Sequence, residues 1–238
     1  MRTVIKYLRP SVPNDHSHQC RAIEMARLAV LDKRPRTIVD LGCGEGLTAD
    51  LFRQWAPDSR WIGVDIEASP EVAKRVRSDV EFVAFDGVIL PFESGSVDLI
   101  FCNQVLEHVR YPEDLLKEVA RTLSEDGKFI GQTSQLEPYH SFSYWNFTVY
   151  GFKRICEDAG LEVIELRPGI DGSTLFQRSY LRKPPEYSKW FVEESPINRE
   201  IEEVVSARGL GVRPANMRKL KFCGQFCFSC KRSNHSIP

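Results

Sequence analysis

Short apolar segments alternate with segments of helical periodicity along most of this 238-residue chain. We expect strands at 36–41, 60–66, 80–86, 97–104, 127–134 and 161–168, and a last strand within 221–232. We expect helices at 16–32, 45–56, 112–123 and 148–161, and another that starts at Ser69 and Pro70. Apolar strands that alternate with helices predict an α/β fold: a doubly wound, mostly parallel seven-stranded sheet, with an N-terminal helix.

The length predicts a single domain spanning residues 1–238. Residues 168–218 lie between the sixth and the last strand and are long for a connection. They include an expected helix over 195–208, with Pro196 in its first turn. Because connections of this length are usually functional, we expect an insertion that acts as a lid or as a contact in a homodimer.

Composition argues against several partners. The formal net charge is −1, and a nucleic-acid-binding domain is usually basic. No apolar run approaches a membrane span, and the first residues lack the apolar core of a signal peptide. The seven cysteines are an odd number and are expected to be reduced thiols. We therefore predict a cytoplasmic protein with a small-molecule substrate, no nucleic-acid partner and no membrane partner.

The segment "IVDLGCGEGL" (38–47) places a glycine loop after the first strand, where open parallel sheets bind ligands. A phosphate-binding loop requires a lysine after its last glycine, but Leu47 and Thr48 follow Gly46. A dinucleotide fingerprint places its third glycine where Leu47 stands, which argues against an NAD-dependent oxidoreductase.

The pattern Asp-x-Gly-x-Gly-x-Gly, formed by Asp40, Gly42, Gly44 and Gly46, resembles the first motif of class I S-adenosylmethionine-dependent methyltransferases. The segments "GVDI" (63–66) and "AFDGVILPFESGSVDLIFCNQVLEHV" (84–109) are similar to later motifs of the same family, in the same order. The resemblance implies the Rossmann-like methyltransferase fold, methyl-transfer activity and S-adenosyl-L-methionine as cofactor.

The resemblance also implies roles for single residues. Asp65 would accept hydrogen bonds from the ribose hydroxyls, and Ile66 would lie against the adenine. Asp86 would accept from the adenine amino group, while Gly87 would offer its N–H to the ring. The Asn103 carbonyl would face the methionine portion. The predicted cofactor-binding residues are Asp40, Gly42, Cys43, Gly44, Gly46, Asp65, Ile66, Asp86, Gly87 and Asn103.

Two histidines are candidate general bases for a hydroxyl acceptor. His108 follows Glu107 just past the fourth strand, and His140 follows the fifth strand. In quinone-pathway O-methyltransferases, which the chain resembles, an acid three residues before this Glu-His pair completes a metal site. That position is Gln104 here, so we predict no metal.

The segment 134–152 is rich in aromatic residues and is expected to cover the acceptor pocket. The predicted substrate-pocket residues are Glu107, Tyr139, Tyr144 and Trp145. The alternative is that these aromatic side chains only cover the edge of the sheet.

Near the end of the chain, Cys223, Cys227 and Cys230 have the spacing of a radical S-adenosylmethionine iron–sulfur motif. On a strand, Cys223 and Cys227 would share one face and Cys230 would lie on the other, so the three thiols would not converge. We therefore interpret this segment as the last strand.

The leading hypothesis is methyl transfer to a small molecule, most simply to a hydroxyl of a sugar, polyketide or related metabolite. Two alternatives remain: a methyltransferase acting on protein or RNA, and a catalytically inactive regulatory module that binds the cofactor.

Overall fold

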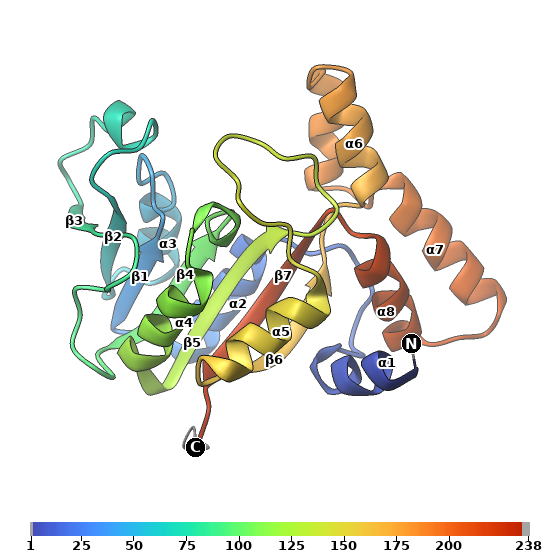
Figure 1. Cartoon of the computed structure of the whole chain (residues 1–238), viewed down its shortest axis with the longest axis horizontal. Coiled ribbons are helices and arrows are strands. Elements are labelled where there is room, and N and C mark those ends of the chain that lie inside the picture. The colour runs from blue at the N-terminus through green and yellow to red at the C-terminus, as the bar shows by residue number, and fades with distance from the viewer. Residues whose placement is uncertain (1, 235–238) are drawn as a thin grey trace.

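The computed structural model describes residues 2–234 and contains one seven-stranded sheet (Figure 1). The strand order is β3-β2-β1-β4-β5-β7-β6. The five strands from β3 to β5 pair in parallel, and β7 runs antiparallel to both β5 and β6. The strands are β1 (Thr37–Leu41), β2 (Arg60–Ile66), β3 (Glu81–Phe85), β4 (Val97–Asn103), β5 (Leu123–Ser134), β6 (Leu161–Pro168) and β7 (Gln225–Arg232). This confirms the predicted fold class.

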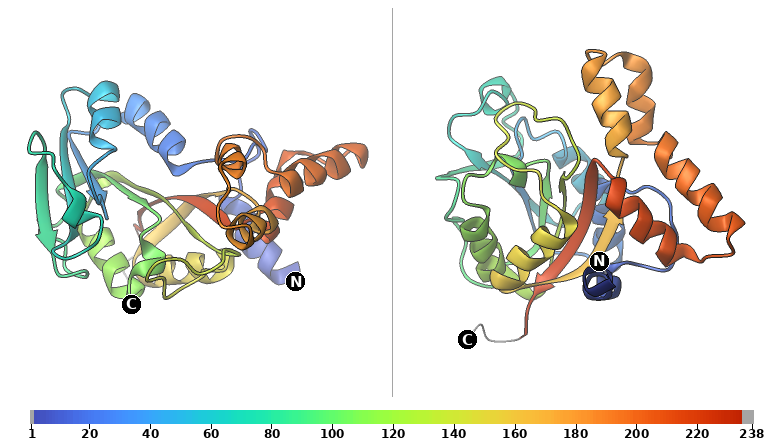
Figure 2. Two further views of the ribbon diagram at one scale, coloured as in Figure 1. Left: turned by 90° about the horizontal axis from the view of Figure 1, so that it is seen from above. Right: turned by 45° about the vertical axis from the view of Figure 1, so that its right-hand side comes forward.

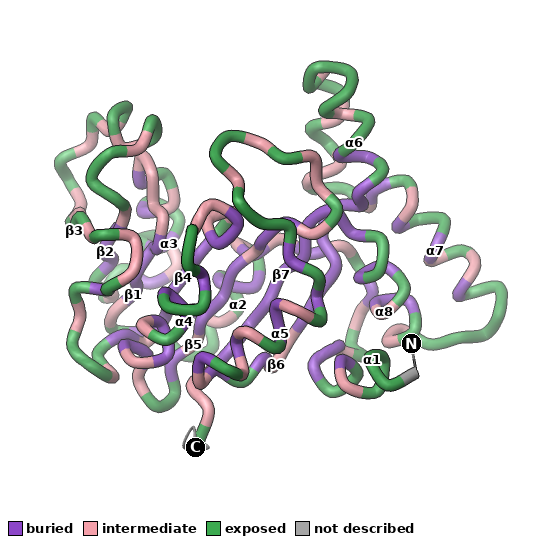
Figure 3. The backbone as a smooth tube through the Cα atoms, viewed as in Figure 1, coloured by how far each residue is buried: buried purple, intermediate pink, exposed green. Residues whose placement is uncertain are grey.

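Helices cover both faces of the sheet, as the apolar strands require. One face packs on α2 and α3, through residues such as Met25 and Phe52. The other packs on α4 and α5, through residues such as Leu116 and Phe152. Figure 3 shows the buried strands between these layers. The helices are α1 (Arg2–Leu8), α2 (Ala22–Lys33), α3 (Ala49–Trp55), α4 (Pro112–Thr122), α5 (Val149–Asp158), α6 (Gly172–Tyr180), α7 (Pro196–Ala207) and α8 (Val212–Phe222), with short 3-10 helices η1 (Arg9–Ser11), η2 (Val72–Lys74), η3 (Leu106–His108) and η4 (Pro185–Phe191).

The helix predicted over 16–32 begins at Ala22, later than expected. The preceding residues are extended because their carbonyls bind the side chains of α8. The Asn216 amide donates to the His16 carbonyl at 2.8 Å, and Lys219 Nζ donates to the Ser17 carbonyl at 2.7 Å. Tertiary hydrogen bonds therefore override the helical spacing of this segment.

The helix predicted at Ser69 and Pro70 is reduced to the short 3-10 helix η2. Ser69 does cap it, because its Oγ accepts from the Val72 N–H at 3.0 Å. The chain then turns away, and the next arginines bind the glycine loop. Arg75 donates to the Gly44 carbonyl, and Arg77 Nη1 donates to the Gly46 carbonyl at 3.1 Å.

The last strand begins at Gln225, because α8 continues to Phe222. The prediction that Cys223 shares a face with Cys227 is therefore wrong: Cys223 precedes the strand. Cys227 lies in the core under α2, whereas Cys223 and Cys230 lie in the core on the other face. These three thiols are free and do not converge, and burial raises the pKa of Cys223 to about 12.

The segment between β6 and β7 contains α6, η4, α7 and α8, of which only α7 was predicted. Figure 2 shows α6 and α7 projecting from the β6–β7 edge of the sheet. Buried Asp171 fixes their base: its carboxylate accepts from the N–H groups of Thr174 and Ile197, at 2.7 and 3.2 Å. Lys219, buried in α8, forms ion pairs with Glu194 and Glu202. The insertion is thus anchored by buried charges.

Candidate active site

The three loop glycines all adopt left-handed backbone conformations, with φ of +74° at Gly42, +51° at Gly44 and +77° at Gly46. Glycine adopts this region at little cost. A Cβ atom at Gly42 would lie 2.2 Å from Val105, and one at Gly46 would lie 2.7 Å from Phe82. These two glycines are therefore needed for packing within the protein itself. A Cβ at Gly44 would meet Glu71 at 3.1 Å.

The predicted ribose acid contacts the glycine loop directly. Asp65, at the end of β2, accepts from the Gly44 N–H through Oδ2 at 2.7 Å and from the Ile66 N–H through Oδ1 at 2.8 Å. Each carboxylate oxygen has further lone pairs, so this arrangement leaves acceptor capacity for two hydroxyls. The ends of β1 and β2 are thus joined at the site.

The predicted adenine-binding residues lie at the neighbouring strand ends. Ile66 is 42% exposed, and a Cβ at Gly87 would be in ordinary contact with it at 3.6 Å. Asp86 Oδ1 accepts from the N–H groups of Val88 and Ile89, at 2.9 and 2.7 Å. These hydrogen bonds hold the pKa of Asp86 below its ordinary value, so it is a charged acceptor.

Asp40 is only 3% exposed and supports the loop, with its carboxylate accepting a hydrogen bond from the Thr48 hydroxyl. Burial raises the pKa of Asp40 to about 7, and the charge of Asp65 acts in the same direction. Cys43 is half-buried, and burial raises the pKa of its thiol to about 12. Both residues therefore shape the loop.

A cavity of about 400 Å³ lies beside the glycine loop. Leu47 and Thr48 line it on the loop side, and Asn103 lines it from the end of β4. Its other walls come from distant parts of the chain: Gln19 precedes α2, and Phe191 ends η4 of the insertion. The insertion thus contributes to the space that opens beside the loop.

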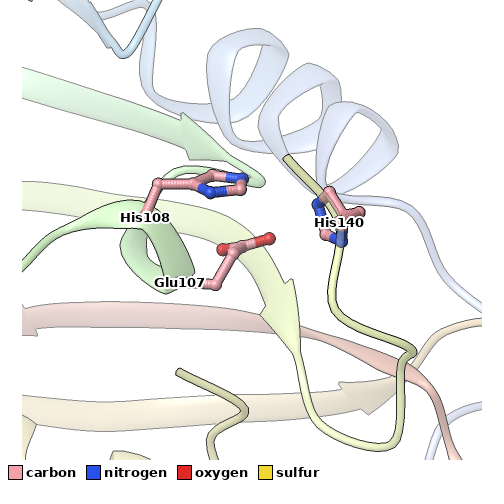
Figure 4. Close-up of side chains that lie close together, drawn as sticks. All are labelled: Glu107, His108 and His140. Atoms are coloured by element: carbon pink, nitrogen blue, oxygen red, sulfur yellow. The ribbon is translucent and has the colours of Figure 1, made fainter. Parts of the chain in front are cut away.

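The predicted bases are neighbours in space. His108 ends η3, and His140 lies in the long loop after β5, yet their ring centroids are 5.1 Å apart with near-perpendicular planes. Figure 4 shows both rings together with the Glu107 carboxylate. Burial lowers the pKa of His108, and the charge of His140 adds to this shift, so both favour the neutral imidazole.

Glu107 is completely buried. Its carboxylate accepts from the hydroxyls of Thr133 and Ser134, at 2.9 and 3.2 Å. Its backbone carbonyl accepts from the N–H groups of Tyr144 and Trp145, at 2.7 and 3.1 Å. Burial raises the pKa of the Glu107 carboxyl to about 7. The loop after β5 is therefore attached to η3 at the residue that carries the buried acid.

Comparisons with known proteins agree with this geometry. A family model described as a methyltransferase domain matches residues 39–131. A demethylmenaquinone methyltransferase of Thermus thermophilus is 29% identical over 199 residues, covering 81% of this chain and 80% of the relative. A crystal structure of 1,6-didemethyltoxoflavin-N1-methyltransferase from Burkholderia thailandensis, with bound S-adenosylhomocysteine, aligns with a TM-score of 0.54 at 16% identity, over 90% of this chain and 79% of that one. Residues 39–131 therefore match a methyltransferase domain, and the chain is similar to S-adenosylmethionine-dependent methyltransferases.

Other relatives match this chain over a smaller part of their length. A malonyl-[acyl-carrier protein] O-methyltransferase of Legionella pneumophila is 31% identical over 105 residues, 42% of this chain and 37% of the relative. In the first three curated relatives the chain spans 34%, 46% and 37% of their length. The similarity therefore supports the domain and its cofactor, S-adenosylmethionine, but it does not identify the acceptor.

The residues at the ends of β1, β2 and β3 fit that cofactor. The glycines keep side chains out of the loop, Asp65 has acceptor capacity for ribose hydroxyls, and Ile66 beside Gly87 offers an apolar surface for adenine. The charged carboxylate of Asp86 suits an amino group as its partner. When bound, S-adenosylmethionine supplies an activated methyl group on a sulfonium centre.

The predicted aromatic pocket wall is only partly formed. Tyr139 and Tyr144 are 87% and 60% exposed, so they do not enclose a pocket in this structure, and their role in binding the acceptor stays a prediction. Trp145 is half-exposed, and its Nε1 donates to the Val109 carbonyl at 2.9 Å. In Figure 1 the loop that carries them arches above the ends of β5 and β7. The loop contacts Glu107 through two backbone N–H groups and Val109 through the Trp145 side chain, and it brings His140 next to His108.

Sequence reasoning missed several groups that shape the site. Arg75 and Arg77 hold the carbonyls of the glycine loop, and Arg75 also stacks on the Phe82 ring at 3.7 Å. Gln225 of β7 donates to both Gln104 and Glu137, at 3.0 and 2.8 Å. No motif marked these residues, because their role depends on strand order and loop paths. The clustering of arginines at 75 and 77 was the only available signal.

Proposed function

We propose that this protein transfers the methyl group of S-adenosylmethionine to a hydroxyl oxygen of a small molecule, such as a sugar, polyketide or related metabolite. The observation that carries the proposal is the hydrogen bond between the Gly44 N–H and Asp65. It joins the glycine loop and the predicted ribose acid next to β4, where the strand order reverses and such sheets bind their ligands.

The acceptor is proposed to lie beside Glu107, His108 and His140. Val105, two residues before Glu107, packs against Gly42, and Glu71 lies against Gly44 while its charge acts on His108. The three polar side chains therefore adjoin the glycine loop. This placement is supported by the position of η3, directly after the strand whose end would face the methionine portion.

In the proposed reaction, the acceptor oxygen attacks the methyl carbon while the bond from carbon to sulfur breaks. The sulfur keeps the electron pair and becomes a neutral thioether, and the hydroxyl proton passes to an imidazole nitrogen of His108 or His140. Since the methyl group is already activated, holding the three atoms in line supplies most of the acceleration. The base contributes a further factor of about 10²–10⁴.

The insertion after β6 is proposed to act as a lid that sets acceptor specificity, with Phe191 as its contact to the cavity. A contact between two copies of the chain is the alternative role for its exposed side chains, among them Phe176 and Tyr180. No helix among the described residues is long and apolar enough to cross a membrane.

The test is a reaction with S-adenosylmethionine carrying a trideuterated methyl group, offered together with pools of hydroxyl-bearing metabolites. Mass spectrometry should detect an acceptor that gains the labelled methyl, and S-adenosylhomocysteine should form in equal amount. The Gly44→Val variant is the matched blank. Tight cofactor binding without transfer to any acceptor would instead support the regulatory module, and labelled protein or RNA would support a macromolecular substrate.

A further inference from the structure

Three side chains of the kind that bind metal ions converge at the proposed acceptor site. One carboxylate oxygen of Glu107 and one nitrogen from each of His108 and His140 all lie within 4.8 Å of one another. Glu107 and His108 lie on η3, while His140 comes from the loop after β5 (Figure 4). Two separate segments therefore build this group.

The backbone holds the two segments in place. The Tyr144 and Trp145 N–H groups donate to the Glu107 carbonyl, which attaches the loop to η3. Within the loop, the Ser143 hydroxyl accepts from the His140 N–H at 3.1 Å and also lies 2.9 Å from the His140 carbonyl. The approach of His140 to Glu107 is thus fixed by hydrogen bonds on both sides.

The group contains a buried acid that has hydroxyl partners but no cation beside it among the described residues. Glu107 is 0% exposed and is bound by Thr133 and Ser134 only through neutral hydroxyls. A second acid, Glu137, shares the Ser134 hydroxyl with Glu107. Burying a carboxylate is costly unless a positive partner or a metal ion is present. A bound cation would supply that charge.

One imidazole nitrogen also lacks a partner. His140 Nδ1 is buried without a hydrogen bond, and it lies 3.8 Å from Glu137 Oε1. An imidazole that binds a metal ion usually donates the N–H of its other nitrogen to a carboxylate, a backbone carbonyl or water, and this hydrogen bond fixes the orientation of the ring. Glu137 is itself held by Gln225 and Ser134, at 2.8 and 2.7 Å. In this arrangement Nε2 is the His140 nitrogen that would bind a metal ion.

We propose that Glu107, His108 and His140 bind one divalent transition-metal ion. Two imidazoles and one carboxylate suit manganese, iron, cobalt or zinc better than magnesium or calcium, which prefer oxygen ligands. Bonds of about 2.0–2.2 Å would bring the ligand atoms to roughly 3–4 Å from one another, so a small closure of the loop completes the site.

The proposed site departs from the sequence prediction of no metal. That prediction treated Gln104 as the missing third ligand. In the structure Gln104 Oε1 accepts from Gln225, and the third ligand-type side chain is His140, from a segment 32 residues after His108 in the sequence. Sequence spacing around the Glu-His pair could not reveal it.

The inference deepens the proposed function and rests on its placement of the acceptor. A metal ion with three protein ligands keeps open positions, and an acceptor hydroxyl bound there would lose its proton more readily. The methyl group would then pass to that oxygen, and the sulfur would leave as a thioether as before. In this form the histidines act as ligands, and the proton goes to solvent.

Metal binding is tested without any methyl transfer, by titrating chelator-treated protein with Co²⁺ and following its visible absorption. The wild type and the control variant His18→Ala, which removes an exposed histidine elsewhere, should each bind one Co²⁺ per chain. His140→Ala, His108→Ala and Glu107→Gln should each bind at least about tenfold more weakly. Thermal melts establish that each variant is folded. His140→Ala is the variant least expected to disturb folding, because His140 lies in a loop.

Binding of Co²⁺ by His140→Ala as tight as by the wild type would overturn the proposal, as would a wild type that binds none. Calorimetry with S-adenosylmethionine on the metal-free protein separates this result from the proposed function. Cofactor binding without metal binding rejects only the metal site. Metal binding without cofactor binding rejects the proposed function and leaves the metal site standing.

Discussion

The Gly44 N–H donates a hydrogen bond to Asp65 Oδ2 at 2.7 Å, which links the first glycine loop to the end of the neighbouring strand. Gly44 follows β1, and Asp65 lies in β2, with Asp40 paired opposite Gly63 in the ladder between them. The bond holds the loop backbone and the acid in one rigid unit. Both sides of the proposed cofactor site therefore depend on the same contact.

Replacing Asp65 with alanine should weaken S-adenosylmethionine binding by at least about tenfold. The substitution removes a charged acceptor whose hydrogen bonds contribute about 1.5–3 kcal/mol each, and it also frees the Gly44 N–H. Calorimetric titration measures the change. Asp58→Ala, at an exposed turn, serves as the control and should bind normally. An Asp65→Ala protein with unchanged affinity would remove the basis for the ribose assignment.

A valine at Gly44 should abolish detectable cofactor binding. The backbone there has φ of +51°, and the added Cβ would lie 3.1 Å from Glu71. The matched control is Gly209→Val, since Gly209 has φ of +64° but no atom within 4 Å of its added Cβ. Left-handed strain costs about 1–2 kcal/mol at either position. If both variants lose the same stability and both bind the cofactor, the loop is not the binding site.

The two histidines should behave as one unit. His108→Ala and His140→Ala should each lower kcat by about 10²–10⁴-fold, whether they accept a proton or bind a metal ion. Because their rings are 5.1 Å apart, the double variant should be little slower than either single variant. Steady-state kinetics, with His18→Ala as the reference, measure this. A double variant whose loss in kcat equals the product of the two single losses would show that the two residues act independently.

Asp40 should make the folded state less stable as pH rises. Its folded pKa is raised to about 7, above the ordinary value of 3.8, so its contribution is fully present below about pH 4. Between about pH 4 and pH 7 the contribution is lost, which lowers the free energy of unfolding by a few kcal/mol at most. The difference in unfolding free energy between wild type and Asp40→Asn should therefore change across this window, as denaturant titrations can measure. A constant difference throughout this window would contradict the raised pKa.

Phe191→Ala should raise the KM for the acceptor and leave the melting temperature almost unchanged. Phe191 belongs to the insertion and lines the cavity beside the glycine loop. Phe176→Ala is the control, because Phe176 lies in the same insertion and is 63% exposed. Equal kinetic parameters in both variants would show that the insertion is no lid over this cavity.

The sequence revealed the strands better than the helices, for a physical reason. β2 and β6 match the predicted bounds of 60–66 and 161–168, because both are short segments that contain β-branched residues, which favour strands. The segment 16–21 has helical spacing, but its carbonyls bind Asn216 and Lys219, about 200 residues away. Contacts between distant segments override local periodicity, and they are absent from any short window of sequence.

The same limit applies to the site. The glycine loop and Asp65 could be predicted because each lies in a short sequence motif at the end of a strand. His140 carries no motif of its own, since its value depends on a loop that returns to Glu107 through two backbone hydrogen bonds. Exposure of Tyr139 and Tyr144 likewise depends on the path of that loop. Composition predicted an aromatic segment over the site but not which atoms face it.

The central claim is that the glycine loop and Asp65 bind S-adenosylmethionine so that its methyl group faces Glu107, His108 and His140. A crystal structure of the protein with S-adenosylhomocysteine tests this most directly. The account predicts ribose hydroxyl oxygens within about 2.6–3.2 Å of the Asp65 carboxylate, and the sulfur on the side of η3. A nucleoside bound elsewhere, or a sulfur directed away from Glu107, would contradict it.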